Sequence, residues 1–164
     1  MRILLLGNAG AGKSTLARRL IAGGNVARLA LDEIAWDGGT QRKPLDESRA
    51  LLLAFIRTHR HWVIEGCYGD LVETALPYCD ELIFLNPGVD TCIDHCRRRP
   101  WEAEKFASAA EQQAMLDKLI QWIGDYPTRQ DEYGLARHRA LFEGFTGRKR
   151  ECQSPYDYPS SPAE

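Results

Sequence analysis

Short apolar runs alternate with segments of helical periodicity along most of the chain. These runs lack the strict polar alternation of a half-exposed strand, which is typical of strands covered on both faces of a sheet. A weaker run at residues 139–145, interrupted by Gly144, predicts one more strand. The four stronger runs cover residues 3–6, 26–31, 62–64 and 82–85.

Helical patterns fall between and after the apolar runs. The clearest spans residues 111–123, where apolar side chains recur at i, i+3, i+4 and i+7 from Leu116 and predict an amphipathic helix. Strands and helices that alternate in this way predict an α/β fold, with a mostly parallel sheet and helices on both of its faces. The other predicted helices cover residues 13–21, residues 46–58 behind Pro44, and a segment that begins near Val89.

The composition fits one compact domain. The 164 residues are 44% hydrophobic, which is enough to bury a core. The apolar runs are far shorter than the roughly 20 residues that cross a bilayer, and no leader-like segment opens the chain, so we expect a cytoplasmic protein without a membrane partner. Five cysteines at irregular spacing suit a reducing compartment. A net charge of −2 argues against broad nucleic-acid binding.

A glycine-rich stretch, GNAGAGKST at residues 7–15, joins the first predicted strand to the first predicted helix. It satisfies G-x-x-x-x-G-K-[ST] in the strand-to-helix context that this pattern requires. The glycines let backbone N–H groups point at phosphate oxygens, while the helix directs its positive end at the same place. Lys13 is expected to neutralise the β- and γ-phosphates, and Ser14 to ligate Mg²⁺. The expected nucleotide-binding residues are Asn8, Ala9, Gly10, Ala11, Gly12, Lys13, Ser14 and Thr15.

This loop predicts binding of a nucleoside triphosphate but does not specify the reaction. A GTPase needs a guanine-reading N-K-x-D, which the sequence lacks. Motor and helicase ATPases need a longer chain. A small phosphotransferase is the class that remains.

Six motifs then occur in a recognisable order: GNAGAGKSTLARRL, LALDEIAW, HWVIEGCY, ELIFLNP, an arginine-rich segment at 97–99, and WIGDYPTR. In this order, over about residues 1–150, the sequence resembles the small P-loop kinases known as topology modulation proteins, which are similar to adenylate and shikimate kinases. The resemblance implies a three-layer P-loop fold with a five-stranded parallel sheet of order 2-3-1-4-5. It implies a single kinase domain over residues 1–152 with an arginine-bearing helical lid around 97–125. The Pro- and Ser-rich segment 153–164 is expected to be a mobile tail.

Asp32 comes directly after the second predicted strand. Ligands of open parallel sheets bind beyond the carboxyl ends of the strands, so Asp32 is expected to face the end of the glycine-rich loop. A carboxylate there orients Mg²⁺ through water or accepts the proton of an attacking hydroxyl. In shikimate-type kinases a matching aspartate does such work. The alternative is an exposed loop acid or a helix cap.

Glu65 and Gly66 end the third predicted strand, where adenylate kinase relatives often carry Asp-Gly. We expect Glu65 to hold Mg²⁺ directly or through water, the alternative being a structural hydrogen bond. Gly66 allows close approach of the acceptor to the backbone, and Cys67 and Tyr68 are expected to line the acceptor pocket. Three tryptophans are expected in the core or in a pocket wall: Trp36, Trp62 and Trp122.

Arg97, Arg98 and Arg99 precede Pro100. In the resemblance this position begins a lid that closes on the phosphates. Delocalised cations brought in by closure stabilise charge on the transferring phosphoryl group and exclude water. The alternatives are capping of a helix end and solvation of a surface.

Further arginines are candidates for substrate contacts. Arg57 follows the buried face of a predicted helix and is expected to reach an acidic group of the acceptor. Arg129, and with it Arg137, is carried over from the WIGDYPTR-like segment as an acceptor-site residue. Arg148 is the candidate for stacking on adenine, with a solvated charge run as the alternative.

The sequence therefore predicts ATP- and Mg²⁺-dependent transfer of a phosphoryl group to a hydroxyl of a small molecule, by a monomer or homodimer. Asp32 favours an alcohol, because a carboxylate beside the acceptor repels the phosphate of a nucleoside monophosphate. Two alternatives stay open: a nucleoside-monophosphate kinase, and an ATP-binding regulatory or nucleic-acid-associated protein with weak ATPase activity. The expected catalytic residues are Lys13, Asp32, Arg97 and Arg98.

Overall fold

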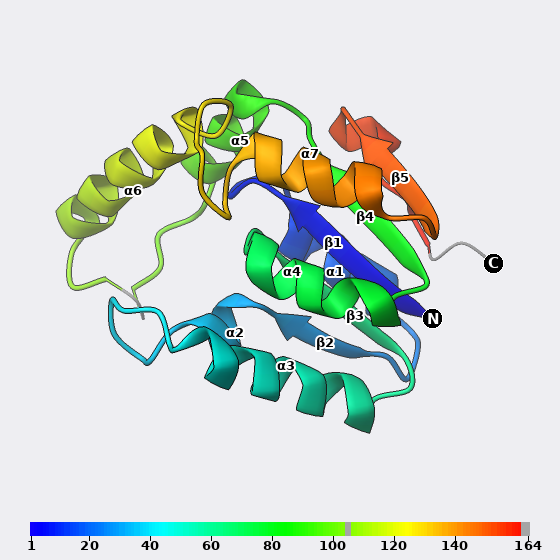
Figure 1. Ribbon diagram of the computed structural model, residues 1–164. Coiled ribbons are helices and arrows are strands. Elements are labelled where there is room, and N and C mark those ends of the chain that lie inside the picture. The colour runs from blue at the N-terminus through cyan, green and yellow to red at the C-terminus, as the bar shows by residue number, and fades with distance from the viewer. Residues whose placement is uncertain (104–105, 162–164) are drawn as a thin grey trace.

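A five-stranded parallel sheet forms the centre of the protein (Figure 1). The computed structural model describes residues 1–103 and 106–161. The strands run in the order β2-β3-β1-β4-β5 and every neighbouring pair is parallel, which confirms the predicted order 2-3-1-4-5. Their bounds are β1 (Arg2–Gly7), β2 (Ala27–Ala30), β3 (Trp62–Gly66), β4 (Glu81–Leu85) and β5 (Arg148–Cys152).

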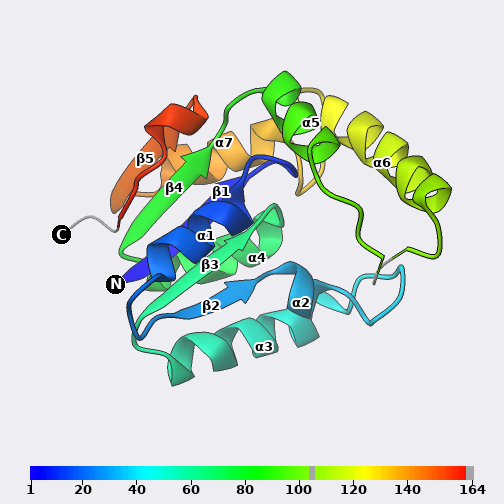
Figure 2. The same cartoon turned by 180° about the vertical axis from the view of Figure 1, so that it is seen from behind.

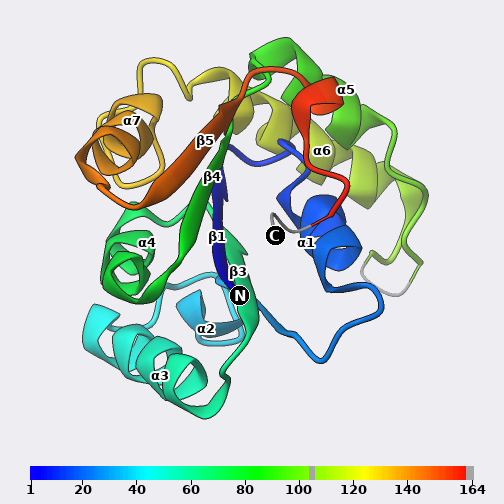
Figure 3. The same cartoon turned by 90° about the vertical axis from the view of Figure 1, so that its right-hand side faces the viewer.

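Helices cover both faces of the sheet, as Figure 3 shows edge-on. One face carries α2 (Asp32–Ala35), α3 (Leu45–Thr58), α4 (Gly69–Ala75) and α7 (Leu135–Gly144). The opposite face, turned towards the viewer in Figure 2, carries α1 (Lys13–Ile21), α5 (Val89–Arg97) and α6 (Ala109–Gly124). Within the described residues, no helix combines the length and the apolar character needed to cross a bilayer.

The first strand shows why the apolar runs do not alternate. Successive side chains of a strand point to opposite faces. Leu4 and Leu6 accordingly lie in the core beneath α3 and α4, whereas Ile3 and Leu5 lie in the core beneath α1 and α5. All four are almost completely buried, so both faces of β1 select for apolar residues.

The prediction of a strand at residues 139–145 is wrong, because this segment belongs to helix α7. His138 and Leu141 are buried three positions apart, which is the spacing of a helix face and not of a strand. The fifth strand is β5, where Arg148, Lys149 and Arg150 are exposed. Charged side chains are common on edge strands, where they discourage pairing with other chains, and they leave no apolar run to recognise.

The predicted lid corresponds to the end of α5, the following loop and helix α6, which extends beyond the sheet in Figure 1. Residues 104 and 105 of this segment lie outside the described residues. Helix α6 begins at the N-cap Ser108, whose hydroxyl accepts from the backbone N–H of Glu111. The Glu111 carboxylate accepts from the backbone N–H of Ala107, the residue before the cap. The start of α6 is therefore encoded locally.

The described part of the segment after β5, for which a mobile tail is predicted, contacts the rest of the protein. It contains the 3₁₀ helix η2 (Pro155–Asp157), whose start is capped by Ser154. The Tyr158 hydroxyl then donates to the carbonyl oxygen of Ala11 at 2.7 Å. This contact seats the segment against the glycine-rich loop. Residues 162–164 of the predicted tail lie outside the described residues.

Candidate functional site

A cavity of about 840 Å³ lies at the carboxyl ends of the strands. The glycine-rich loop forms one side of it, and Asp32, Gly66 and Tyr68 contribute from the ends of β2 and β3. Helices α5 and α6 add side chains from the predicted lid, and η2 adds Pro155. Open parallel sheets bind their ligands at this edge, so the cavity is the candidate site.

The glycine-rich loop between β1 and α1 follows a path that requires glycine. Gly10 has a φ of +78°, and a Cβ atom added to it would lie 2.4 Å from the carbonyl oxygen of Cys92. The ring Nδ1 of His95 lies 2.7 Å from the carbonyl oxygen of Gly10. Helix α5 therefore both crowds the loop and holds it in place.

Lys13 and Asn8 are buried within the loop. The Lys13 ammonium group donates to the backbone carbonyl oxygen of Asn8 at 2.7 Å. The Asn8 side chain in turn donates to the carbonyl oxygen of Ile123, in α6, at 3.3 Å. The second bond joins the loop to the predicted lid. The Lys13 ammonium group lines the cavity, where a bound anion can take the place of the Asn8 carbonyl oxygen.

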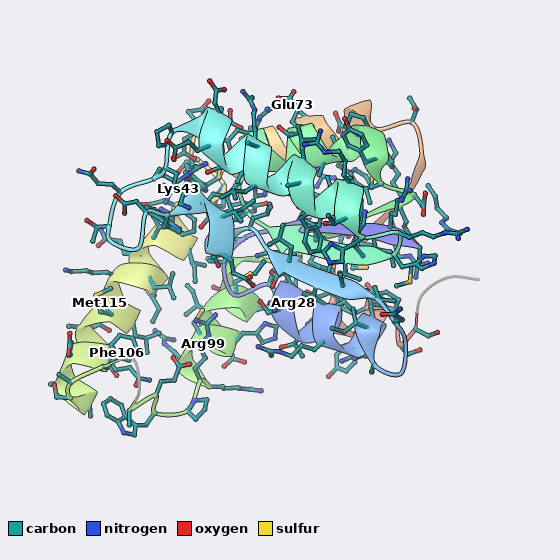
Figure 4. All side chains as sticks on the ribbon, turned by 90° about the horizontal axis from the view of Figure 1, so that it is seen from below. Arg28, Lys43, Glu73, Arg99, Phe106 and Met115 are labelled. Atoms are coloured by element: carbon teal, nitrogen blue, oxygen red, sulfur yellow. The ribbon has the colours of Figure 1, made fainter. Side chains whose placement is uncertain are left out.

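Ser14 and Glu65 meet where α1 begins. The Ser14 hydroxyl donates to the Glu65 carboxylate at 2.7 Å, and Glu65 is 4% exposed. The guanidinium of Arg28, labelled on β2 in Figure 4, donates to the same carboxylate oxygen. No motif around Arg28 indicates that this residue reaches the site. Its charge compensates the buried carboxylate, which would otherwise be costly to desolvate.

Asp32 opens helix α2 and is joined to two aromatic residues. The Tyr68 hydroxyl donates to the Asp32 carboxylate, and the Trp36 indole N–H donates to the Tyr68 oxygen at 2.8 Å. Burial, together with the neighbouring Asp32 charge, raises the pKa of the Tyr68 phenol. Tyr68 therefore keeps its proton and holds one carboxylate oxygen, while Asp32 itself is exposed to the cavity.

The predicted arginines differ in where they lie relative to the cavity. Arg98 lines the cavity, as does Arg99, which Figure 4 labels beyond the end of α5. Arg97 lies on the exposed part of α5 outside the cavity lining. Arg129 stacks behind the cavity wall, 4.4 Å from the ring centroid of Trp122. Arg137 pairs with Glu132 and Glu73.

Arg57 and Arg148 are not brought to the cavity. Arg57 is in the last turn of α3, which ends just before β3 begins. Arg148 is the first residue of β5 and pairs with Glu81, the first residue of β4, at 3.5 Å. Both therefore lie at the amino edge of the parallel sheet, opposite the glycine-rich loop.

Several cavity residues were not identified from the sequence. Trp36 and Trp122, expected in the core or a pocket wall, line the cavity, whereas Trp62 is fully buried. Tyr133 lines it too, although nothing in its sequence neighbourhood indicates a site. Further lining residues are Arg19, His95, Leu119, Pro155 and Tyr158.

Comparisons with known proteins gave only distant structural similarities. No protein-family model and no curated protein matches the chain. A shikimate kinase from Bacteroides thetaiotaomicron aligns with a TM-score of 0.46 and 19% identity, over 87% of this chain and 97% of the kinase. A deoxyadenosine kinase from M. mycoides with bound dATP aligns with a TM-score of 0.47 and 13% identity, over 93% and 90%.

A chain of the Pnkp1/Rnl/Hen1 RNA repair complex aligns with a TM-score of 0.47 and 21% identity, over 75% of this chain. The present chain spans 45% of that chain's length. At TM-scores below 0.5 and identities of 13–21%, these similarities do not indicate the activity of this chain. The sheet order and the loop between β1 and α1 carry the fold assignment. The chain has a three-layer α/β P-loop fold.

Proposed function

We propose that this protein is an ATP- and Mg²⁺-dependent kinase that phosphorylates a hydroxyl group of a small molecule. The observation that carries the proposal is that one cavity is lined by both the Lys13 phosphate loop and the Asp32 carboxylate. The first suits a triphosphate, and the second suits an acceptor that must lose a proton. We further propose one kinase domain over residues 1–152 that works in the cytoplasm as a monomer or homodimer.

ATP would place its phosphates in the glycine-rich loop. Lys13 would exchange the carbonyl oxygen of Asn8 for phosphate oxygens, which are better partners for an ammonium group. Tyr158 lines the cavity beside Gly12, where an added Cβ would lie 3.4 Å from its ring. An aromatic ring there suits contact with a nucleobase, so Tyr158 replaces Arg148 as our candidate for that role.

Ser14 and Glu65 offer oxygen donors side by side, the ligand type that Mg²⁺ requires. We propose that these two residues hold the ion, Glu65 directly or through water, together with the phosphates. Bound there, Mg²⁺ would neutralise charge on the phosphate oxygens. Arg28 would keep the Glu65 carboxylate oriented whether or not the ion is present.

The transfer itself would use Asp32 as the proton acceptor. The acceptor oxygen forms a bond to the γ-phosphorus, its proton passes to the Asp32 carboxylate, and the bond from that phosphorus to the bridging oxygen breaks. ADP leaves with the bridging electron pair. The lid around residues 97–125 would bring Arg98 and Arg99 to the oxygens that carry the developing charge.

A second candidate function is phosphorylation of a nucleoside monophosphate. Arg19, Arg98 and Arg99 all line the cavity, and three cations besides Lys13 suit an acceptor that brings its own phosphate. Asp32 opposes such an acceptor by like-charge repulsion. The alcohol therefore remains the first choice.

Replacement of Lys13 tests the proposed site. Lys13→Ala should lower acceptor-dependent ADP release by at least about a hundredfold, because it removes a cation that stabilises the transferring phosphates. Lys118→Ala, which changes an exposed lysine on α6, serves as the control. Circular dichroism and thermal melts should show that both variants fold. Wild-type turnover in folded Lys13→Ala would contradict the proposal.

A further inference from the structure

Four aromatic side chains form one continuous wall of the cavity. Trp36 contacts Tyr68 edge-to-face with ring centroids 6.5 Å apart. Tyr68 contacts Tyr133 in the same way at 5.4 Å, and Tyr133 contacts Trp122 at 5.7 Å. All four line the cavity, and Leu119 of α6 lies in the same lining.

The polar tips of Trp36, Tyr68 and Tyr133 are bonded within the protein. The Trp36 N–H donates to Tyr68, whose hydroxyl donates to Asp32. The Tyr133 hydroxyl accepts from Arg42 at 2.6 Å. The wall therefore offers a ligand the carbon surfaces of its rings, and few free donors or acceptors.

Two arginines that lie outside the cavity lining contact rings of the wall. The guanidinium of Arg42 lies 4.9 Å from the ring centroid of Tyr68 and 5.9 Å from that of Tyr133. Arg129 lies 4.4 Å from the ring centroid of Trp122 and donates to the carbonyl oxygen of that residue at 2.9 Å. These cations hold the rings in place. The surface is therefore formed before a ligand binds, and binding loses little side-chain entropy in ordering it.

The glycine-rich loop brings charged groups to the cavity lining. Lys13, Ser14 and Glu65 surround the loop, and Asp32 stands where the loop side and the aromatic wall meet. A polyol or sugar needs a hydrogen-bonding partner for each of its hydroxyls. This wall supplies almost none, whereas it offers a flat apolar ring a large contact surface.

On the basis of the proposed kinase activity, we propose that the acceptor is an alcohol carrying a flat aromatic or heteroaromatic ring. The ring packs against Trp36, Tyr133 and Trp122, and the hydroxyl reaches Asp32. Two sources supply this chemistry, nucleosides and simple aryl alcohols. The same transfer applies to either: the hydroxyl proton passes to Asp32 and the phosphoryl group to the hydroxyl oxygen.

The test measures binding and turnover separately. Binding of five alcohols (adenosine, uridine, 4-hydroxybenzyl alcohol, sorbitol and glucose) and of the nucleoside monophosphates AMP and UMP is followed by calorimetry with a non-hydrolysable ATP analogue and Mg²⁺ present. Turnover is followed by ADP release with ATP. Ring-bearing alcohols should bind at least about fivefold more tightly than the polyols, which is the low end of what stacking of one base contributes. The nucleoside and aryl arms tell the two sources apart.

Variants of Tyr133 assign the preference to the wall. Tyr133→Leu should weaken binding of the ring-bearing alcohol about tenfold, while Tyr133→Phe, which keeps the ring, should bind almost as wild type does. Tyr78→Leu removes an exposed ring of the 3₁₀ helix η1 (Leu76–Tyr78), which does not line the cavity, and serves as the control. A KM increase with little change in kcat is expected of Tyr133→Leu, because the wall binds ground state and transition state alike.

Each outcome decides the inference. Equal or tighter binding of sorbitol or glucose, or a Tyr133→Leu variant that keeps the ring preference, overturns it. Tight binding of nucleoside monophosphates with all five alcohols unbound also overturns it and favours the second candidate function. Ring-selective binding without ADP release from any compound supports the inference about the wall, and it contradicts the proposed kinase activity instead.

Discussion

Asp32 and Tyr68 form the pair on which the proposed chemistry depends at the scale of single residues. Tyr68 is 3% exposed and its hydroxyl donates to the Asp32 carboxylate. This bond leaves the other carboxylate oxygen for an acceptor hydroxyl and fixes the direction in which it points. Tyr68 is therefore a positioning residue for Asp32 as well as part of the aromatic wall.

Tyr68→Phe should lower kcat by about tenfold with little change in the Kd for Mg·ATP, because the ring stays and only the bond that orients Asp32 is lost. Tyr126→Phe is the matched control, since it removes another buried tyrosine hydroxyl, bonded to His138 at 2.8 Å. Each variant should lose about 1–2 kcal/mol of stability. Equal effects of the two changes on kcat would assign Tyr68 a purely structural role.

His138 should make the free energy of unfolding depend on pH. Its Nε2 lies 2.9 Å from the carbonyl oxygen of Cys67, which can only accept, so Nε2 carries the proton and Nδ1 accepts from Tyr126. Burial lowers the pKa of His138 from 6.5 to about 4. Between these values the unfolded chain binds a proton that the folded protein does not, so stability falls as pH falls from 6.5 towards 4, by on the order of 2–3 kcal/mol.

Urea unfolding at pH 7.5, 6.5, 5.5 and 4.5 measures this loss. His138→Gln should be less stable than wild type at pH 7.5 but should lose less stability across the same interval, because glutamine does not titrate. Glu151 contributes at lower pH, since the Arg139 guanidinium holds the pKa of that carboxyl at about 2. Parallel stability losses of the two proteins down to pH 4.5 would contradict the assignment to His138.

At the scale of elements, the buried strands and the edge strand β2 were predictable, whereas the charged edge strand β5 was not. The apolar runs of β1, β3 and β4 and the helical spacing of α6 follow directly from burial, and the structure has each within a few residues of its predicted bounds. Strand β5 is an edge strand of charged residues, so burial left no signal in it. The segment after β5 contacts the glycine-rich loop through the single side chain of Tyr158, so its sequence shows no periodic pattern either.

The candidate site divides in the same way. The phosphate loop could be predicted because its residues are consecutive and each has a physical role. Arg28, Tyr133 and Trp122 come from distant segments and meet the site only through the tertiary fold. The sequence could not show that Arg57 and Arg148 lie away from the cavity. The direction of α3 and the position of β5 determine which edge of the sheet these two residues occupy.

The ring of Tyr158, in the segment after β5, is expected to contribute to nucleotide binding. Tyr158→Ser should raise the Kd for Mg·ATP at least about fivefold, because it removes the ring beside Gly12 and the hydroxyl bond to Ala11 can no longer form with the same geometry. Tyr156→Ser is the control, since Tyr156 lies two residues away and is 98% exposed. Nucleotide titration followed by calorimetry measures both. Identical nucleotide affinities in the two variants would remove Tyr158 from the proposed nucleotide site.

At the scale of the whole molecule, the sheet separates two hydrophobic cores and brings their helices together at one edge. The core under α1, α5 and α6 supports the phosphate loop, and the core under α2, α3 and α4 supports Asp32 and Tyr68. The cavity thus receives the glycine-rich loop from one side of the sheet and Asp32 and Tyr68 from the other. Loop and lid are also joined, through Asn8 and Ile123.

Phosphorylation of alcohols by wild type and Asp32→Asn, measured beside the Kd for Mg·ATP, tests the account most directly. Asparagine keeps the shape of the side chain and an oxygen for Tyr68 but cannot accept the proton. The account predicts that product formed from the best alcohol falls by at least about a hundredfold, as loss of a general base does, while the Kd for Mg·ATP stays within about twofold. Rapid wild-type phosphorylation of a nucleoside monophosphate with every alcohol inert, or undiminished turnover of an alcohol in Asp32→Asn, would contradict it.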